Sequence, residues 1–297
     1  MEMTPRERFL AAVNFERTDR PVRLETIGFW DETITRWHGE GLPKEVTDEI
    51  AMYLHEGFDL QVPLIIGSHE HPGYEPLFKE KVIEENERYT IKRDFTGTTV
   101  KIFADGASTI PAFLESPVKS RRDWEGIKWR VDPGSPGRKE KWEPFIDFAQ
   151  QQPWPFIVYA TGLFGTLRQL FGFENLMYAY FDQPDLIHDI SRHWVALWKG
   201  ILAEVAGEKR PDCIYLWEDM CGRNGPLISP NMFDRFMTPY YKELIGFFKE
   251  SLQIPVVGVD TDGDCTKIIP HFVQCGMNLI WPFEVRAGMD VLKVREE

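Results

Sequence analysis

The sequence predicts an α/β fold around a parallel sheet, in the form of a (β/α)8 TIM barrel, and two observations carry this prediction. Short apolar segments alternate with longer helical segments along most of the 297 residues, which is typical of strands joined by crossover helices. Three of the later apolar segments also end in acidic residues, at Glu218, Asp260 and Glu284. Catalytic side chains of such barrels lie at the carboxyl ends of the strands, so we expect the active site there.

The first elements are predicted from capping residues and apolar runs. Thr4 can cap a helix whose first residue is Pro5. Residues 21–29 read as the first strand, a helix around residues 50–54 follows, and residues 59–66 read as the second strand.

The stretch from about residue 76 to residue 105 interrupts this alternation of strands and helices. Apolar and polar residues alternate within it, and a turn sequence lies at Thr96-Gly97. This pattern predicts a β-hairpin insertion after the second strand. The regular pattern then resumes, with helices predicted at 142–151, 163–181, 184–206, from 229 and at 266–275, and strands predicted at 156–160, 213–217, 254–259 and 277–283.

The number of strand and helix units is lower than a complete barrel requires. Six units can be assigned, whereas the closed barrel has eight. Residues 293–297 read as part of a helix without a glycine cap. We therefore expect one domain over residues 1–297 whose barrel is incomplete at its C-terminal end. No glycine-rich phosphate loop follows a strand, so a Rossmann or P-loop fold has no support.

Composition restricts the classes of partner. The formal net charge is −13 and no dense stripe of Lys and Arg occurs, so nucleic acid is not an expected partner. Residues 1–8 are too polar for a signal peptide, and no apolar run approaches the ~20 residues of a membrane helix. Four cysteines without a CxxC pair indicate a reduced, cytoplasmic protein, with zinc ligation by some of them as the alternative.

The acidic residues at the strand ends are the candidate catalytic groups. Glu218 and Asp219 directly follow one strand, and we expect one to point into the barrel while the other pairs with a cation such as Arg223. Asp260 directly follows another buried strand and is a functional candidate for the same reason. Asp264 has a simpler interpretation, as the cap of the helix that begins near residue 266.

Four further residues are candidates for substrate binding. His69 and His71 follow the second strand, where they can bind a ligand or a metal or act as acid or base, with a solvated loop as the alternative. Tyr159 and Trp217 lie on predicted strands near the same end of the barrel. These two side chains can line a pocket, with packing in the core as the alternative.

Several motifs along nearly the whole chain resemble one known superfamily. Residues 3–12 and 19–22 resemble the opening of the uroporphyrinogen decarboxylase superfamily. Stronger matches, to the decarboxylase-related proteins associated with corrinoid methyltransferases, lie at 218–221, 225–230, 236–241 and 260–264. The resemblance implies a (β/α)8 barrel that usually runs on through two further strands, and a homodimer.

The resemblance covers two chemistries, and the decarboxylase chemistry is the alternative here. True decarboxylases carry an Arg-Gln-Ala-Gly-Arg motif after the first strand and an Asp at the end of the second. This chain has Leu-Glu-Thr-Ile-Gly-Phe at 24–29, with Glu25 in place of the arginines, and no acid at 64–67. A porphyrin precursor rich in carboxylates needs cationic partners, so an acidic cleft disfavours this step of porphyrin biosynthesis.

The other chemistry is methyl transfer between a small methylated donor and a corrinoid that a partner protein carries. The methyltransferases of the superfamily, like the cobalamin-independent methionine synthases, bind zinc with His-x-Cys at the end of a strand. Here Asp260 and Asp262 occupy that position, and Glu284 falls where the synthases have a Glu. Oxygen ligands suit harder cations than zinc, so the resemblance implies a divalent metal, either zinc or a harder ion.

Methyl transfer needs activation of the leaving heteroatom, which that metal or an acid such as protonated Glu218 can supply. Asp219 and Glu25 complete the expected catalytic set. A third interpretation is a degenerate barrel without catalytic activity that serves binding or assembly.

Overall fold

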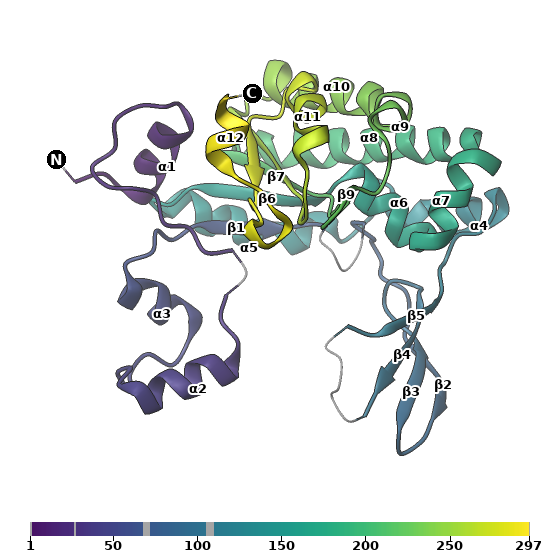
Figure 1. Cartoon of the computed structure of the whole chain (residues 1–297), viewed down its shortest axis with the longest axis horizontal. Coiled ribbons are helices and arrows are strands. Elements are labelled where there is room, and N and C mark those ends of the chain that lie inside the picture. Colours follow the sequence, from purple (N-terminus) through teal and green to yellow (C-terminus); the bar gives the residue numbers. More distant parts are fainter. Residues whose placement is uncertain (1, 27, 68–71, 105–109, 297) are drawn as a thin grey trace.

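The computed structural model describes residues 2–26, 28–67, 72–104 and 110–296. Its centre is a five-stranded parallel sheet, in which the strands lie side by side in chain order (Figure 1). The strands are β1 (Val62–Ile65), β6 (Phe156–Thr161), β7 (Cys213–Trp217), β10 (Val256–Asp260) and β11 (Leu279–Trp281). Each neighbouring pair is parallel, as expected of strands connected by crossover helices.

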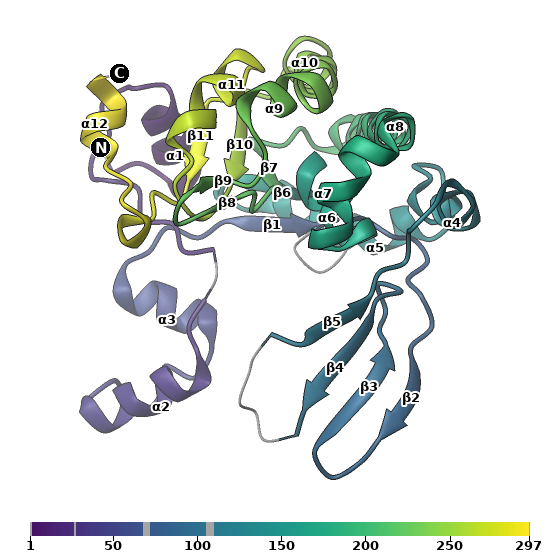
Figure 2. The same ribbon diagram turned by 45° about the vertical axis from the view of Figure 1, so that its right-hand side comes forward.

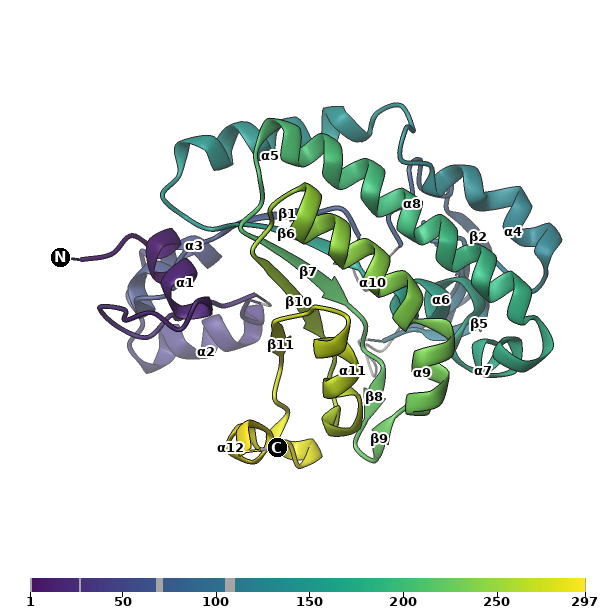
Figure 3. The same cartoon turned by 90° about the horizontal axis from the view of Figure 1, so that it is seen from above.

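Helices cover one face of this sheet, which we call the outer face. Figure 3 shows α5, α8, α10 and α11 lying across it. The helices that follow the insertion are α4 (Arg121–Ile127), α5 (Arg138–Gln151), α6 (Leu163–Phe171), α7 (Phe173–Asp182), α8 (Pro184–Glu208), α9 (Pro230–Phe236), α10 (Thr238–Gly246), α11 (Ile269–Gln274) and α12 (Val291–Glu296). Short elements complete this part of the chain: η1 (Lys128–Val131), η2 (Phe247–Ser251), η3 (Thr266–Ile268), η4 (Val285–Ala287), β8 (Cys221–Gly222) and β9 (Gly225–Pro226).

The two faces of the sheet differ in burial. Val158, Ile214 and Val257 stand side by side on the outer face and are fully buried beneath the helices. The opposite face, which we call the inner face, carries Tyr159 and Trp281, which are only half-buried. Successive side chains of a strand point to opposite faces, so the same strands supply both the core and a partly open surface.

Helix α1 (Pro5–Val13) packs against the inner face. Its Phe9 is buried against Ile157, Cys213, Tyr215 and Val256 of the sheet. The helix begins as the sequence predicts, because the Thr4 hydroxyl accepts the Glu7 backbone N–H and the Glu7 carboxylate accepts the Thr4 backbone N–H. This reciprocal pair satisfies two donors that a helix start otherwise leaves free.

Replacing Thr4 with alanine should lower the free energy of unfolding by about 1 kcal/mol, because the first turn of α1 loses its cap. Chemical denaturation monitored by circular dichroism measures the change. Thr47→Ala is the matched control, since Thr47 is exposed and its hydroxyl makes no hydrogen bond within the described chain. Equal stability of the two variants would show that the capping pair contributes nothing.

A charge network holds the segment after α1 against the start of β1. Arg8 and Asp59 are both buried and form an ion pair. Arg8 Nε also donates to Asp19 Oδ1 at 2.7 Å, and Arg20 Nη2 donates to Asp59 Oδ1 at 2.8 Å. The Asp-Arg-Pro sequence at 19–21 therefore has a structural role, since it supplies partners for charges that burial would otherwise penalise.

The structure corrects the prediction of a strand over residues 21–29. The described residues of this stretch form no strand, although Arg23 O accepts the Asp59 backbone N–H. The chain instead enters a small helical lobe with α2 (Asp31–Glu40) and α3 (Glu49–Glu56). Ring contacts inside the lobe partly bury Phe29, which packs on Trp37 at 5.4 Å between ring centroids instead of joining the sheet.

The insertion is larger than the predicted hairpin. It is a four-stranded antiparallel sheet of β2 (Lys81–Glu85), β3 (Tyr89–Arg93), β4 (Thr99–Phe103) and β5 (Ala112–Glu115). Figures 1 and 2 show this sheet and the α2–α3 lobe projecting to the same side of the molecule. The inner face of the central sheet is turned toward that side, because α5, α8, α10 and α11 cover the outer face.

Two predicted long helices are each divided. The predicted helix at 163–181 breaks at Gly172, which has a φ of 74°. The predicted helix from residue 229 is divided into α9 and α10 at Met237, where φ is −122° and the break has a different cause from that at Gly172. A left-handed residue cannot continue an α-helix, and glycine adopts that conformation without the penalty of a Cβ.

The prediction of an α/β fold with a parallel sheet is confirmed. The sheet has five strands where the sequence predicts six, and within the described chain β1 and β11 remain its edges rather than closing a barrel. Among the described helices, none combines the length and the apolar character needed to cross a membrane.

Candidate functional site

The carboxyl ends of β7 and β10 form the candidate site. Asp260 is the last residue of β10 and stands beside Trp217 on one side and Trp281 on the other. All three side chains belong to the inner face and are half-buried. Tyr215, two residues before Trp217, lies on the same face, with its ring 5.0 Å from Tyr159 and 5.9 Å from Trp281 between centroids. A carboxyl group thus emerges at the edge of an aromatic wall.

Asp260 is an unusually weak acid for a carboxyl group. Burial is the largest cause and, together with the negative charges of Asp262 and Asp219, it raises the pKa of Asp260 to about 7, while Tyr215 has a smaller lowering effect. Burial and the charges of Asp219 and Glu284 also raise the pKa of Asp262. Near pH 7 a substantial fraction of Asp260 therefore carries a proton, which is the condition for a general acid.

Asp219 pairs with Arg168 rather than with the predicted Arg223. Arg168 Nη1 lies 2.8 Å from Asp219 Oδ2 and donates to Asp219 O at 3.0 Å. The same guanidinium lies over the Trp217 ring at 4.7 Å. Asp219 has a φ of 45°, a conformation that Asp tolerates better than most residues, and this turn directs its carboxylate toward α6.

Removing Arg168 should change the electrostatics of the whole site. In Arg168→Ala the charge of Asp219 loses its cation, so the pKa of Asp260 should rise above its wild-type value. Stability should fall by about 1 kcal/mol, from the loss of an ion pair and a ring contact. Titration of the Asp260 carboxyl carbon by NMR measures the pKa. Arg223→Ala is the matched control and should leave the pKa of Asp260 unchanged, because Arg223 is exposed. A larger pKa shift in Arg223→Ala than in Arg168→Ala would contradict the pairing of Asp219 with Arg168.

Glu218 does not face the inner surface, contrary to its prediction as the catalytic acid. Its side chain is fully buried behind the sheet, where Oε1 accepts the Leu163 backbone N–H at 2.9 Å and Oε2 accepts the Gly165 N–H at 2.8 Å. These are the first residues of α6, so the carboxyl group caps that helix. Burial raises the pKa of Glu218 to about 8, although the helix N–H groups lower it.

The described residues do not assemble the predicted metal centre. Asp260, Asp262 and Glu284 approach closely enough to influence each other's charge, but no three His, Cys, Asp or Glu side chains of the described chain are grouped so that they can hold a metal ion. Glu284 Oε2 instead accepts the Gly263 backbone N–H at 2.8 Å. Among the described residues, these three carboxylates are therefore not grouped as a metal site.

The structure places three of the remaining predicted residues, Asp264, Glu25 and Tyr159. Asp264 Oδ1 accepts the Thr266 backbone N–H at 3.0 Å at the start of η3, although the N-cap residue of η3 is Cys265 rather than the predicted Asp264. Glu25 is half-buried, and its backbone carbonyl accepts Gln61 Nε2 at 3.3 Å. The Tyr159 hydroxyl donates to Gln61 Oε1 at 3.0 Å, so Gln61 links these two candidates at the β1 side. His69 and His71 lie outside the described residues.

Two residues of the site, Tyr215 and Arg168, were not predicted from the sequence, and only the first could have been. Tyr215 can be found from the two-residue period of the strand, because that period places it on the same face as Trp217. Arg168 has no such signal, since 51 residues separate it from Asp219 and only the fold brings them together. The four cysteines are all buried and free.

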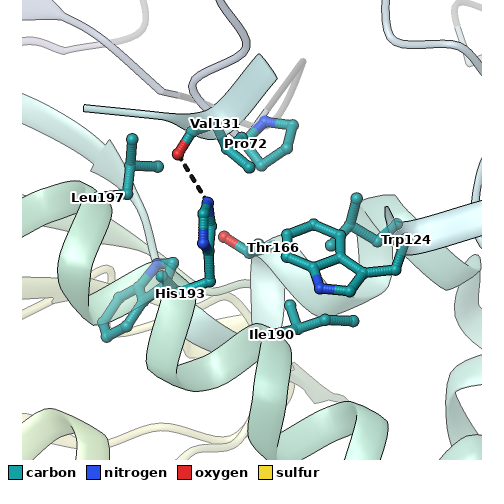
Figure 4. Close-up of a pocket in the computed structure, with 9 residues that line it drawn as sticks. Pro72, Trp124, Val131, Thr166, Ile190, His193 and Leu197 are labelled. Atoms are coloured by element: carbon teal, nitrogen blue, oxygen red, sulfur yellow. Dashed lines mark hydrogen bonds between the residues drawn. The ribbon is translucent and has the colours of Figure 1, made fainter. Parts of the chain in front are cut away.

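A small cavity elsewhere in the protein is too narrow for a substrate. It lies beneath α8, where His193, Thr166 and Trp124 are among its lining residues (Figure 4). His193 Nε2 lies 3.0 Å from Val131 O and is thereby engaged by the backbone. At about 10 Å³ the space suits at most one water molecule.

Comparison with known proteins shows a similar fold. No protein-family model matches the chain, and no curated protein matches it in sequence. Among solved structures, the chain is similar to a methyltransferase from Methanosarcina mazei, with a TM-score of 0.58 and 17% sequence identity over 94% of this chain and 76% of the other. At this identity the likeness concerns the fold, and it supports the α/β architecture described above.

Proposed function

We propose that this protein is a methyl-transfer enzyme that takes a methyl group from a small ether or amine and passes it to a corrinoid held by a separate protein. The observation that carries the proposal is Asp260, a carboxyl group that is partly protonated near pH 7 at the end of a barrel-type strand, beside an aromatic surface. Catalytic groups of barrel enzymes lie at this end of the strands.

Asp260 would act on the leaving heteroatom of the donor. As the methyl–oxygen or methyl–nitrogen bond breaks, its electron pair passes to the heteroatom, and Asp260 supplies the proton that makes the product a neutral alcohol or amine. The methyl group passes to the reduced cobalt of the corrinoid, which contributes the electron pair of the new bond. Protonation of a poor leaving group is worth roughly 10²–10⁴-fold in rate.

Neighbouring residues would place the donor and maintain the acid. Tyr159 and Trp281 offer apolar surface to the methylated end of the donor. Asp262 and Asp219 keep the pKa of Asp260 high, and Arg168 limits the negative charge by pairing with Asp219.

Two further observations bear on the choice of reaction. The similar fold belongs to a protein whose name is methyltransferase, which agrees with the proposal. The alternative, decarboxylation of a porphyrin precursor, has no support from the site, because Asp219, Asp260 and Asp262 would repel a substrate rich in carboxylates.

The test is methyl transfer to free cob(I)alamin in the presence of purified protein. Small methyl ethers, methylamines and methyl thioethers serve as donors, and the absorption spectrum reports conversion to methylcobalamin. We expect turnover with at least one ether or amine and a rate that falls above pH of about 7, where Asp260 loses its proton. Absence of turnover across the donors, or a rate that rises through pH 7, would overturn the proposal.

A further inference from the structure

A second, larger cavity lies at the edge of the central sheet, apart from the candidate site. Its volume is about 220 Å³, and it is enclosed between β1, α5 and the chain that leads into the insertion. Strands β6 and β7 separate β1 from the strand that carries Asp260. Nothing described so far assigns it a role.

The walls of this cavity are largely apolar. Helix α5 contributes one face, because its lining residues have the spacing of neighbours on a helix. The apolar side chains around the space are Leu64, Ile65, Ile66, Leu77, Trp142 and Phe145. Ile65 is 63% exposed although it belongs to a strand of the central sheet, so one wall of the cavity is uncovered.

A buried cation forms part of the lining. Arg138 is only 5% exposed, and its guanidinium donates to two backbone carbonyls, from Nε to Asp132 O at 2.8 Å and from Nη2 to Arg130 O at 3.0 Å. Within the described chain no carboxylate forms an ion pair with it. The nearby Glu75 is already paired with Lys141. Burial of the guanidinium lowers the pKa of Arg138, while the charges of Glu75 and Asp132 raise it by less.

Two residues of the lining also carry buried donors without partners. The Tyr74 hydroxyl and the Trp142 indole N–H make no hydrogen bond to any described residue, and both side chains are 3% exposed. Each such group costs about 1–3 kcal/mol relative to a satisfied one. Both donor atoms are closed off from the space of the cavity, so Arg138 is the lining group that has a charge without an ionic partner among the described residues.

We propose that this cavity binds a small organic carboxylate with an aromatic or branched aliphatic body. The planar guanidinium of Arg138 matches the two oxygens of a carboxylate, and the apolar walls match the body of the acid. A cavity of about 220 Å³ limits the ligand to a small molecule. A monoanion is favoured over a phosphate dianion, because Glu75 adds negative charge near the single guanidinium.

Calorimetric titration with phenylacetate, and with phenylacetamide as its neutral counterpart, tests the proposal on the intact protein. We expect phenylacetate to bind at least tenfold more tightly than the amide, since only the acid carries the charge that Arg138 recognises. Equal affinities, or no binding of phenylacetate at millimolar concentration, would overturn the proposal.

Two variants separate binding from folding. Ile65→Trp should fill the uncovered side of the cavity and reduce phenylacetate affinity at least tenfold, whereas Ile83→Trp, at a similarly exposed isoleucine of β2, should leave it unchanged. Tyr74→Phe should raise the melting temperature of the free protein, because it removes an unsatisfied hydroxyl, and should leave phenylacetate affinity unchanged, because that hydroxyl is closed off from the cavity. An Ile65→Trp protein with wild-type affinity would contradict the assignment.

Discussion

Glu218→Ala is expected to lower the free energy of unfolding by about 3–5 kcal/mol, the largest stability change of any single substitution considered. The buried carboxyl group accepts backbone N–H groups at the start of α6, and its removal leaves these donors unsatisfied beside a new cavity. Urea denaturation measures the loss. Glu243→Ala is the matched control and should cost at most about 1 kcal/mol, because Glu243 is exposed and pairs with Lys199 at the surface.

Gly162→Ala tests the contact between the Glu218 carboxyl group and the start of α6 by changing the residue on the α6 side. A Cβ at position 162 would lie 2.2 Å from Glu218 Cδ, so the single variant should be destabilised by about 1–3 kcal/mol. In a Glu218→Ala background the clash disappears, and the added methyl group should then cost much less. Simple additivity of the two substitutions would show that they do not share this contact.

The pH dependence of stability gives an independent check on Glu218. Burial raises the pKa from 4.5 in an exposed Glu to about 8 in the fold, so between these values the folded protein holds a proton that the unfolded chain has lost. The contribution of this group to stability is therefore complete at low pH and is lost as pH rises toward 8. Glu218→Gln cannot ionise, and its stability should decline less between pH 5 and pH 8 than that of the wild type. An identical decline would mean that Glu218 is already charged at pH 5.

Asp260→Asn should reduce the rate of methyl transfer at least 100-fold while leaving the fold intact. The amide keeps the size of the carboxyl group but has no acidic proton to give to the leaving heteroatom. Stability should be unchanged or higher above pH of about 7, since the variant no longer places a charge beside Asp262 and Asp219. Single-turnover assays with cob(I)alamin and denaturation curves measure the two effects.

Asp264→Asn is the control for that experiment. Asp264 belongs to the same acidic segment, but its carboxylate accepts the Thr266 backbone N–H, a bond that an Asn side chain can also accept. The Asp264 variant should retain wild-type activity. If Asp260→Asn keeps more than a tenth of the wild-type rate, or if both variants lose activity equally, Asp260 is not the proton donor.

The central sheet was predictable because each of its strands carries a local signal. Short apolar runs at 213–217 and 254–259 coincide with β7 and nearly with β10, and Asp260 ends its strand as the pattern implies. The first predicted strand was wrong because apolar residues alone do not distinguish a strand from an aromatic cluster. Phe29, for example, packs against Trp37 in the α2–α3 lobe instead of joining the sheet.

The different roles of Glu218 and Asp219 could not be predicted from sequence patterns. Glu218 and Asp219 are adjacent and chemically alike, and the prediction gave both a catalytic role. In the fold, Glu218 reaches α6 through residues 53 to 55 positions away in sequence, and Asp219 turns toward Arg168. A pattern of neighbouring residues carries no information about contacts with partners so far away in the sequence.

The sequence by itself determined the class of fold, the strands that carry the site and the acidic character of their carboxyl ends, because hydrophobic periodicity and strand ends are local properties. Tertiary structure alone decided which acid caps α6, which cation pairs with Asp219, and why Asp260 is partly protonated near pH 7. Burial and charge are sums over every atom nearby, and most of those atoms belong to distant parts of the chain.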